Sequence, residues 1–129
     1  MKTASVAVFG WLVPGGAYLP SRRYLRFALC LALVTSAFCA GVALRGADLW
    51  PQAAELQGID GLTALLAEAG AATTALAGGP YLLARLFGYS ETFTGGRVHE
   101  YGTTLMLLAG LFNLLMLADG LKRRKEENK

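Results

Sequence analysis

Polar and ionisable side chains are rare in the long apolar stretches of this 129-residue sequence, so each one is a candidate for chemistry. Asn113 stands inside an uncharged run, and Asp119 follows it at the end of the same run. In a bilayer an amide or a carboxylate is costly unless it is paired. For Asn113 we expect an interhelical hydrogen bond, with a ligand or ion contact as the alternative. For Asp119 we expect a local ion pair with Lys122 and Arg123.

His99, the single histidine, is the candidate ligand for a cofactor. It precedes the last apolar run, next to Glu100. A lone histidine can be an axial ligand to haem or to a pigment. At the start of a helix, the simpler interpretation is a loop histidine beside a glutamate that complements the helix dipole. We therefore expect no cofactor, and haem or pigment ligation through His99 is the weakest alternative.

The remaining residues form no catalytic or metal-binding pattern. The apolar runs contain no serine–histidine–aspartate set, no cysteine with a nearby base and no paired carboxylates. Cys30 and Cys39 point to opposite faces of one helix and lack the spacing of metal ligands. No glycine pair is followed by the lysine and hydroxyl residue of a phosphate loop. We expect a protein that is not an enzyme and that binds no metal.

Composition and charge distribution indicate an integral membrane protein. Hydrophobic residues make up 54% of the chain and charged residues 16%, against about 25% charged residues in soluble domains. Residues 27–44 and 101–118 contain no charged side chain. Each run approaches the roughly 20 residues that a helix needs to cross a bilayer. We expect an all-α fold, with residues 1–129 forming a single membrane domain.

Three transmembrane helices are expected, over about residues 5–19, 24–44 and 101–121. The first two would form an N-terminal hairpin, since a short turn with Pro20 joins them. Pro14, Gly15 and Gly16 interrupt the first span, because proline removes a backbone donor and glycine allows close packing. A signal peptide is the other reading of this segment, but it would place the following arginines outside.

Residues 62–87 are apolar, but Gly78-Gly79-Pro80 divides them into two pieces. Neither piece is long enough to span a bilayer cleanly. We expect two helices, about 62–77 and 81–87, that lie on the outer face of the membrane or re-enter it. A four-span topology, in which this segment crosses, is the alternative.

Two basic clusters flank the apolar runs and predict the orientation of the chain. The first cluster precedes residue 27 and the second follows residue 121; together they comprise Arg22, Arg23, Arg26, Lys122, Arg123, Arg124 and Lys125. Basic residues concentrate on the cytoplasmic side of membranes, so both clusters and the C-terminus are expected there. Two crossings between them satisfy this rule, and the three-span count then places the N-terminus outside. No basic patch is interleaved with aromatic residues, so we expect no nucleic-acid partner.

Small residues within the runs are expected to pack against other helices. Ser36 and Ala40, like Ala37 and Gly41, recur four residues apart on one helix face. Such spacing lets a partner backbone approach closely. The expected packing and interface residues are Pro14, Gly15, Gly16, Ser36, Ala40, Gly41, Gly110 and Asn113.

The stretch from Gly10 to Arg23, with its W-x-x-P-G element, resembles the start of small bacterial membrane-hairpin families. The stretch from His99 to Gly120, with E-Y-G-T-T and A-G-L-x-N-L-L, is similar to the C-terminal span of a bacterial family of unknown function. The matching positions are Glu100, Tyr101, Gly102, Thr103, Thr104, Asn113 and Asp119. The resemblance implies a multi-pass protein of the bacterial inner membrane and implies no activity.

The function expected from these observations is that of a small, non-catalytic membrane subunit. It would be an accessory or scaffolding component of a larger membrane complex, for example an energy-transducing one. Its partners would be lipids and other membrane subunits, or itself. The alternative is an oligomeric transport or channel component, which would need a polar stripe along a span. Thr35, Ser36 and Asn113 are the candidates for such a stripe.

Overall fold

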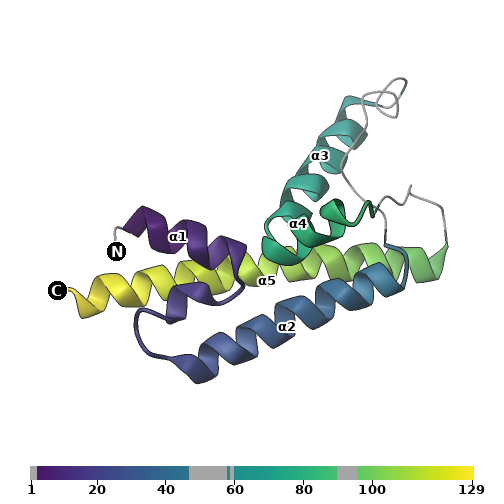
Figure 1. Ribbon diagram of the computed structural model, residues 1–129. Helices are drawn as coiled ribbons and strands as arrows, with labels where there is room; N and C mark the ends of the chain where they lie inside the picture. Colours follow the sequence, from purple (N-terminus) through teal and green to yellow (C-terminus); the bar gives the residue numbers. More distant parts are fainter. Residues whose placement is uncertain (1–2, 47–57, 59, 90–95) are drawn as a thin grey trace.

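The computed structural model describes residues 3–46, 58, 60–89 and 96–129, and the elements in this part of the chain are helices (Figure 1). They are α1 (Thr3–Leu12), the short 3-10 helix η1 (Gly16–Tyr18), α2 (Tyr24–Ala43), α3 (Gly61–Ala75), α4 (Gly79–Leu86) and α5 (Arg97–Glu127). The expected all-α fold is confirmed, and helices occur in each of the segments predicted to contain one.

Helices α2 and α5 form an antiparallel pair that runs the length of the molecule (Figure 1). Glycines allow their backbones to meet: a Cβ atom added to Gly41 would lie 2.7 Å from the carbonyl oxygen of Gly102. Both helices are long and apolar enough to cross a membrane by length and composition. Helix α2 matches the predicted segment 24–44 within a residue, whereas α5 extends beyond the predicted 101–121 at both ends.

The expected first span, residues 5–19, is not one helix. Helix α1 ends at Leu12, and its ten residues rise only about 15 Å. The chain turns at Pro14 and Gly15, where Gly15 has φ of +80°, and η1 returns toward the end where α1 began (Figure 1). A left-handed glycine after a proline reverses the chain, because neither residue continues an α-helix. The prediction of three spanning helices is therefore corrected: the described part of the chain has two helices of spanning length, and residues 5–19 do not form a third.

This reversal also changes the expected orientation of the N-terminus. Helix α1 begins at the end of the molecule where α5 finishes (Figure 1). The three-span count placed the start of the chain at the opposite end from the basic clusters. Because the chain reverses after α1, the first residues of α1 lie at the same end as both clusters.

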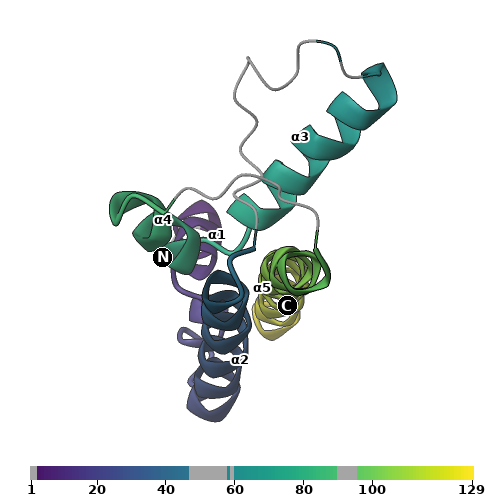
Figure 2. The same cartoon turned by 90° about the vertical axis from the view of Figure 1, so that its right-hand side faces the viewer.

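Helices α3 and α4 form a second bent unit, which meets the α2–α5 pair near its middle. The C-terminal end of α3 contacts α5, while the rest of α3 leaves the bundle and projects to one side (Figures 1 and 2). Gly78, with φ of +73°, forms the bend, and Pro80 occupies the first turn of α4. Proline suits a first turn because it donates no backbone hydrogen bond there. These bounds agree closely with the predicted helices 62–77 and 81–87.

The core lies between α2, α5 and the bend from α3 into α4. Its buried members are Val34, Phe38, Ala77, Tyr81, Met106 and Ala109. Small alanines stand among larger side chains here, which lets the helices approach closely.

Candidate functional site

Asn113 marks the point where the two bent units meet inside the molecule. Its side chain is 1% exposed. The Nδ2 group donates to the carbonyl oxygen of Trp11, 3.1 Å away, and to that of Leu76, 2.8 Å away. Trp11 is near the end of α1 and Leu76 follows the end of α3, where backbone carbonyls lack partners within their own helix. One amide of α5 therefore joins the ends of two short helices.

Glycines make this junction tight. A Cβ atom on Gly78 would lie 1.8 Å from the carbonyl oxygen of Trp11, and one on Gly79 would lie 2.3 Å from that of Leu12. The carbonyl end of α1 thus faces the amino end of α4, which is the favourable head-to-tail arrangement of two helix dipoles. The indole Nε1 of Trp11 also donates to the carbonyl oxygen of Ala75, at 3.2 Å.

The Oδ1 atom of Asn113 is the unusual feature of the junction. It is buried and accepts no hydrogen bond from the described part of the chain. Such an acceptor costs free energy in an apolar interior unless a donor reaches it. The junction therefore combines a polar atom with the ends of two helices that stop within the molecule, an arrangement that transporter folds use to contact substrates and ions.

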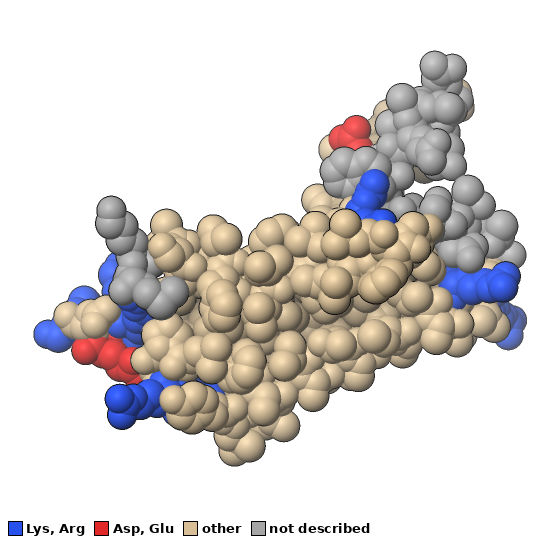
Figure 3. Space-filling view, viewed as in Figure 1, with Lys and Arg blue, Asp and Glu red and all other residues tan. Residues whose placement is uncertain are grey.

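A second polar cluster closes the end of the molecule where the two basic clusters lie and where Figure 3 shows basic and acidic side chains together. The hydroxyl of Tyr18 donates to Asp119 at 2.8 Å, and the Nε of Arg123 donates to the same carboxylate oxygen at 2.8 Å. Arg26 approaches that oxygen at 3.9 Å. The local pair expected for Asp119 is confirmed with Arg123, and the structure adds partners from η1 and α2.

The two basic clusters lie side by side at this end. Ser21 donates to Glu127 at 2.8 Å, and Arg23 lies 3.6 Å from the same side chain. These contacts join the turn before α2 to the last turn of α5. Lys122, Arg124 and Lys125 occupy the same stretch of α5. The two clusters therefore lie at the same end of the molecule, and the side of a membrane on which they lie stays a prediction.

We expect Tyr18→Phe to destabilise this end of the molecule. The variant loses the hydrogen bond to Asp119, which ties η1 to α5. Bonds to charged groups contribute about 1.5–3 kcal/mol, and solvent screening of a carboxylate that is 38% exposed reduces this to about 1 kcal/mol. Thermal unfolding in a mild detergent measures the change. Tyr24→Phe is the control, because Tyr24 is 63% exposed and also loses only a hydroxyl. Equal melting temperatures for the two variants would contradict the prediction.

The predicted packing residues fall into two groups. Pro14, Gly15, Gly16, Gly41 and Gly110 are buried in contacts between segments of this chain. Ser36 and Ala40 are exposed, and the Ser36 hydroxyl bonds the Leu33 carbonyl of its own helix. These two residues therefore take no part in packing within the chain, and their role toward another chain stays a prediction.

His99 lies in the first turn of α5, at the end of the molecule opposite the basic clusters. Its Nδ1 atom is 3.1 Å from the carbonyl oxygen of Arg45. Within the described residues, no group of three or more histidine, cysteine, aspartate or glutamate side chains is arranged to hold a metal ion.

The sequence analysis missed that the two bends share a motif. Residues 15–19 and 78–82 both read G-G-x-Y-L. The first glycine of each has a left-handed φ, and each tyrosine, Tyr18 and Tyr81, is less than 10% exposed. Comparing the two glycine pairs together with the residues that follow them would have indicated two similar bends.

A family model matches residues 5–128 of the chain. The protein belongs to DUF6677, a family of unknown function. Membership covers both bends, the α2–α5 pair and the junction at Asn113. No curated protein and no solved structure matched the chain. The expected resemblance to a family of unknown function is confirmed at this level.

Proposed function

We propose that this DUF6677 protein is an integral protein of the bacterial inner membrane, with α2 and α5 as its two crossing helices. The support is the surface of these helices. Large apolar side chains stand exposed along both, including Leu25 at 75%, Leu29 at 61% and Leu115 at 65%. In water such a surface would be costly, whereas lipid covers it at no cost. The face in Figure 3 has a broad uncharged belt between charged ends.

The proposed orientation places the basic end in the cytoplasm. Arg22, Arg23 and Arg26 before α2 lie at the same end as the basic last turns of α5. Positive-inside orientation then puts both termini of the described chain on the cytoplasmic side. Helix α1 would enter the membrane from the cytoplasmic side, and the chain would return to that side after it. The bend between α3 and α4 would meet the end of α1 inside the membrane, at Asn113.

Within the membrane, the proposed role is that of a non-catalytic accessory or scaffolding subunit. The observation that carries this proposal is the projecting part of α3. Leu62, Leu65 and Leu66 are 70%, 62% and 64% exposed, and they stand three and four residues apart on a helix that leaves its own bundle (Figure 2). A helix presenting such residues away from its own chain suits a groove on another subunit. The partner in this role is a different membrane protein.

We expect a triple variant, Leu62→Ala, Leu65→Ala and Leu66→Ala, to lose the partner subunit. Alanine keeps α3 helical but removes the side chains that would fill a partner groove. The measurement is extraction from native membranes in mild detergent, with light scattering for mass and mass spectrometry for co-eluting chains. The control is Leu29→Ala with Leu33→Ala, which removes exposed leucines from α2.

The wild-type protein should elute with another subunit, the triple variant without it, and the control with it. A wild-type protein that elutes as a single chain with no partner would overturn the subunit role.

An oligomeric transport or channel component is the second candidate. It is favoured by the junction itself, where the carbonyl ends of two short helices accept hydrogen bonds from Nδ2 of Asn113. The Oδ1 atom of the same side chain is buried there and accepts no hydrogen bond from the described residues. The same extraction separates the candidates. A homo-oligomer that elutes without other chains would favour transport, whereas a stoichiometric complex with different chains would favour the accessory role.

A further inference from the structure

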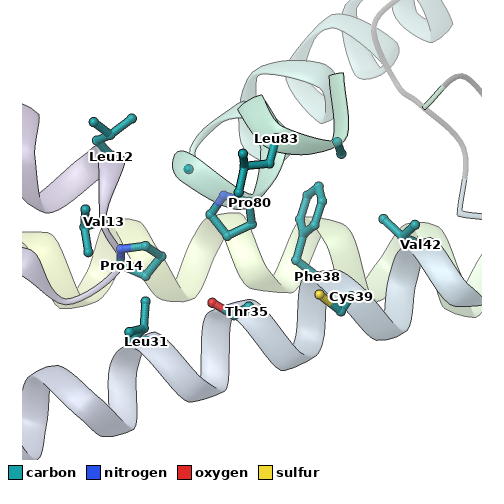
Figure 4. A pocket seen from close by; sticks show the side chains of 12 residues that line it. Leu12, Val13, Pro14, Leu31, Thr35, Phe38, Cys39, Val42, Pro80 and Leu83 are labelled. Atoms are coloured by element: carbon teal, nitrogen blue, oxygen red, sulfur yellow. The ribbon is translucent and has the colours of Figure 1, made fainter. Parts of the chain in front are cut away.

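An apolar groove lies on the side of the bundle between the tip of the first bend, α2 and α4 (Figure 4). Its volume is about 440 Å³. Val13 and Pro14 form one wall, Leu31 and Thr35 of α2 form the floor, and Pro80 and Leu83 form the other wall. Leu83 is 55% exposed, so the groove is open to the surroundings of the helices rather than enclosed.

The groove has a defined depth relative to the basic end of α2. Thr35 follows Arg26 by nine residues, which is about 14 Å along a helix. One leaflet of a bilayer core is about 15 Å thick. Given the membrane location proposed above, the groove lies where the acyl chains of the leaflet next to the basic residues end.

One face of α2 leads from the basic end into the groove. Tyr24, Ala28, Leu31 and Thr35 follow each other at intervals of four, three and four residues, so they lie along one helix face. Tyr24 and Ala28 are exposed, and Leu31 and Thr35 belong to the groove. Ala28 has a small side chain, so no large side chain of this helix face stands between Tyr24 and Leu31.

Positive charge gathers at the end of α2 where this face begins. Arg22, Arg23 and Arg26 lie within the turn and first residues of α2. The side chains of Arg23 and Arg26 remain 38% and 46% exposed, and their carboxylate partners are 3.6 and 3.9 Å away. Guanidinium groups in such long, solvent-exposed pairs keep N–H donors for a phosphate, which arginine binds in a bidentate manner.

We propose that this surface binds one anionic phospholipid. Its phosphate lies on Arg22 and Arg23, and one acyl chain follows the face of Tyr24 and Ala28 into the groove. The charge at one end and the apolar groove one leaflet deep match the two parts of such a lipid. This inference rests on the proposed membrane location but not on the proposed partner.

Native mass spectrometry tests the site on purified protein mixed with equal amounts of phosphatidylglycerol and phosphatidylcholine with the same acyl chains. The wild-type protein should retain one phosphatidylglycerol in preference to phosphatidylcholine. In the double variant Arg22→Gln, Arg23→Gln, the ratio of retained phosphatidylglycerol to retained phosphatidylcholine should fall about tenfold. Thr35→Trp, which fills the groove, should lose retention of both lipids. Leu29→Trp places the same ring on another face of α2 and should retain the lipid.

The cysteines give a second readout that needs no substitution. Cys39 is exposed and lines the groove, whereas Cys30 is buried, so alkylation by maleimide reports on Cys39. Phosphatidylglycerol added to the detergent-solubilised protein should slow this alkylation, and phosphatidylcholine should slow it less.

Several results would overturn the lipid site. One is that the wild-type protein retains the two lipids equally. Another is that the Thr35→Trp and Leu29→Trp variants lose lipid retention to the same extent. A third is that neither lipid slows the alkylation of Cys39. A wild-type dimer that Thr35→Trp converts to monomers would also overturn it, since a second copy would then occupy the groove. A protein absent from the membrane fraction would instead refute the proposed location. Lipid retention by a protein without partners would support the site and count against the subunit role.

Discussion

Gly110→Ala should separate α3 from α5 and destabilise the protein by about 3 kcal/mol, at the upper end of the cost of inserting one methyl group into a packed core. Gly110 is buried in the middle of α5, and a Cβ atom there would lie 1.8 Å from the carbonyl oxygen of Thr73. A flexible side chain can move aside, but here the obstacle is the backbone of α3. Relief therefore requires the helix to shift.

Gly61→Ala is the matched control for this substitution. Gly61 begins α3, and a Cβ atom there meets nothing within 4 Å. Alanine favours the helical conformation over glycine, so this variant should be as stable as the wild type or slightly more stable. Thermal unfolding in detergent compares the two, and hydrogen exchange of residues 70–77 reports on α3 itself. If the two variants have the same melting temperature, the close approach of α3 and α5 is not a feature of the folded protein.

The long helices are the part of the fold that the sequence predicts best. A long uncharged run with few helix breakers predicts one long helix, because a helix bonds its backbone groups within the segment. Helix α2 therefore agrees with prediction to within a residue. A buried amide must likewise be paired, so the sequence predicts that Asn113 makes hydrogen bonds. It does not predict which carbonyl groups accept them.

The first segment was mispredicted because apolar composition does not distinguish one continuous helix from a short helix after which the chain reverses. Residues 5–19 have the length and hydropathy of a short span, yet Gly15 adopts a left-handed conformation that reverses the chain. Proline followed by glycine is compatible with a kink or with a reversal. The decision depends on tertiary contacts, such as the one that a Cβ atom on Gly15 would make with Cys30 at 2.7 Å.

The candidate site was only partly predictable for a related reason. Small residues at intervals of four occur on more than one face of α2, and spacing does not tell which face meets α5. Gly41 lies on the packed face, whereas Ser36 and Ala40 lie on the exposed one. Similarly, the Arg123 partner of Asp119 is local and could be predicted, but the Tyr18 partner is 101 residues away.

Asn113→Leu should have the other large effect, because it removes the donor that joins the ends of α1 and α3. Leucine has a similar size, so the change isolates the hydrogen bonds from the packing. The carbonyl oxygens of Trp11 and Leu76 would be left in an apolar interior, at a cost of about 2–4 kcal/mol. Hydrogen exchange should rise in residues 9–16 and 74–82, while the distant contact of Gly41 with Gly102 should stay protected.

A comparison with Asn113→Asp separates the donor from the acceptor of this side chain. The aspartate keeps an oxygen in place of Oδ1, but it replaces the amino group that faces the two carbonyls. If the Nδ2 bonds hold the junction together, aspartate should destabilise the protein at least as much as leucine, since a carboxylate would face two carbonyl oxygens. If aspartate is tolerated and leucine is not, the oxygen is the essential atom. The junction would then serve a bound proton or cation, and the evidence would move from the accessory role toward transport.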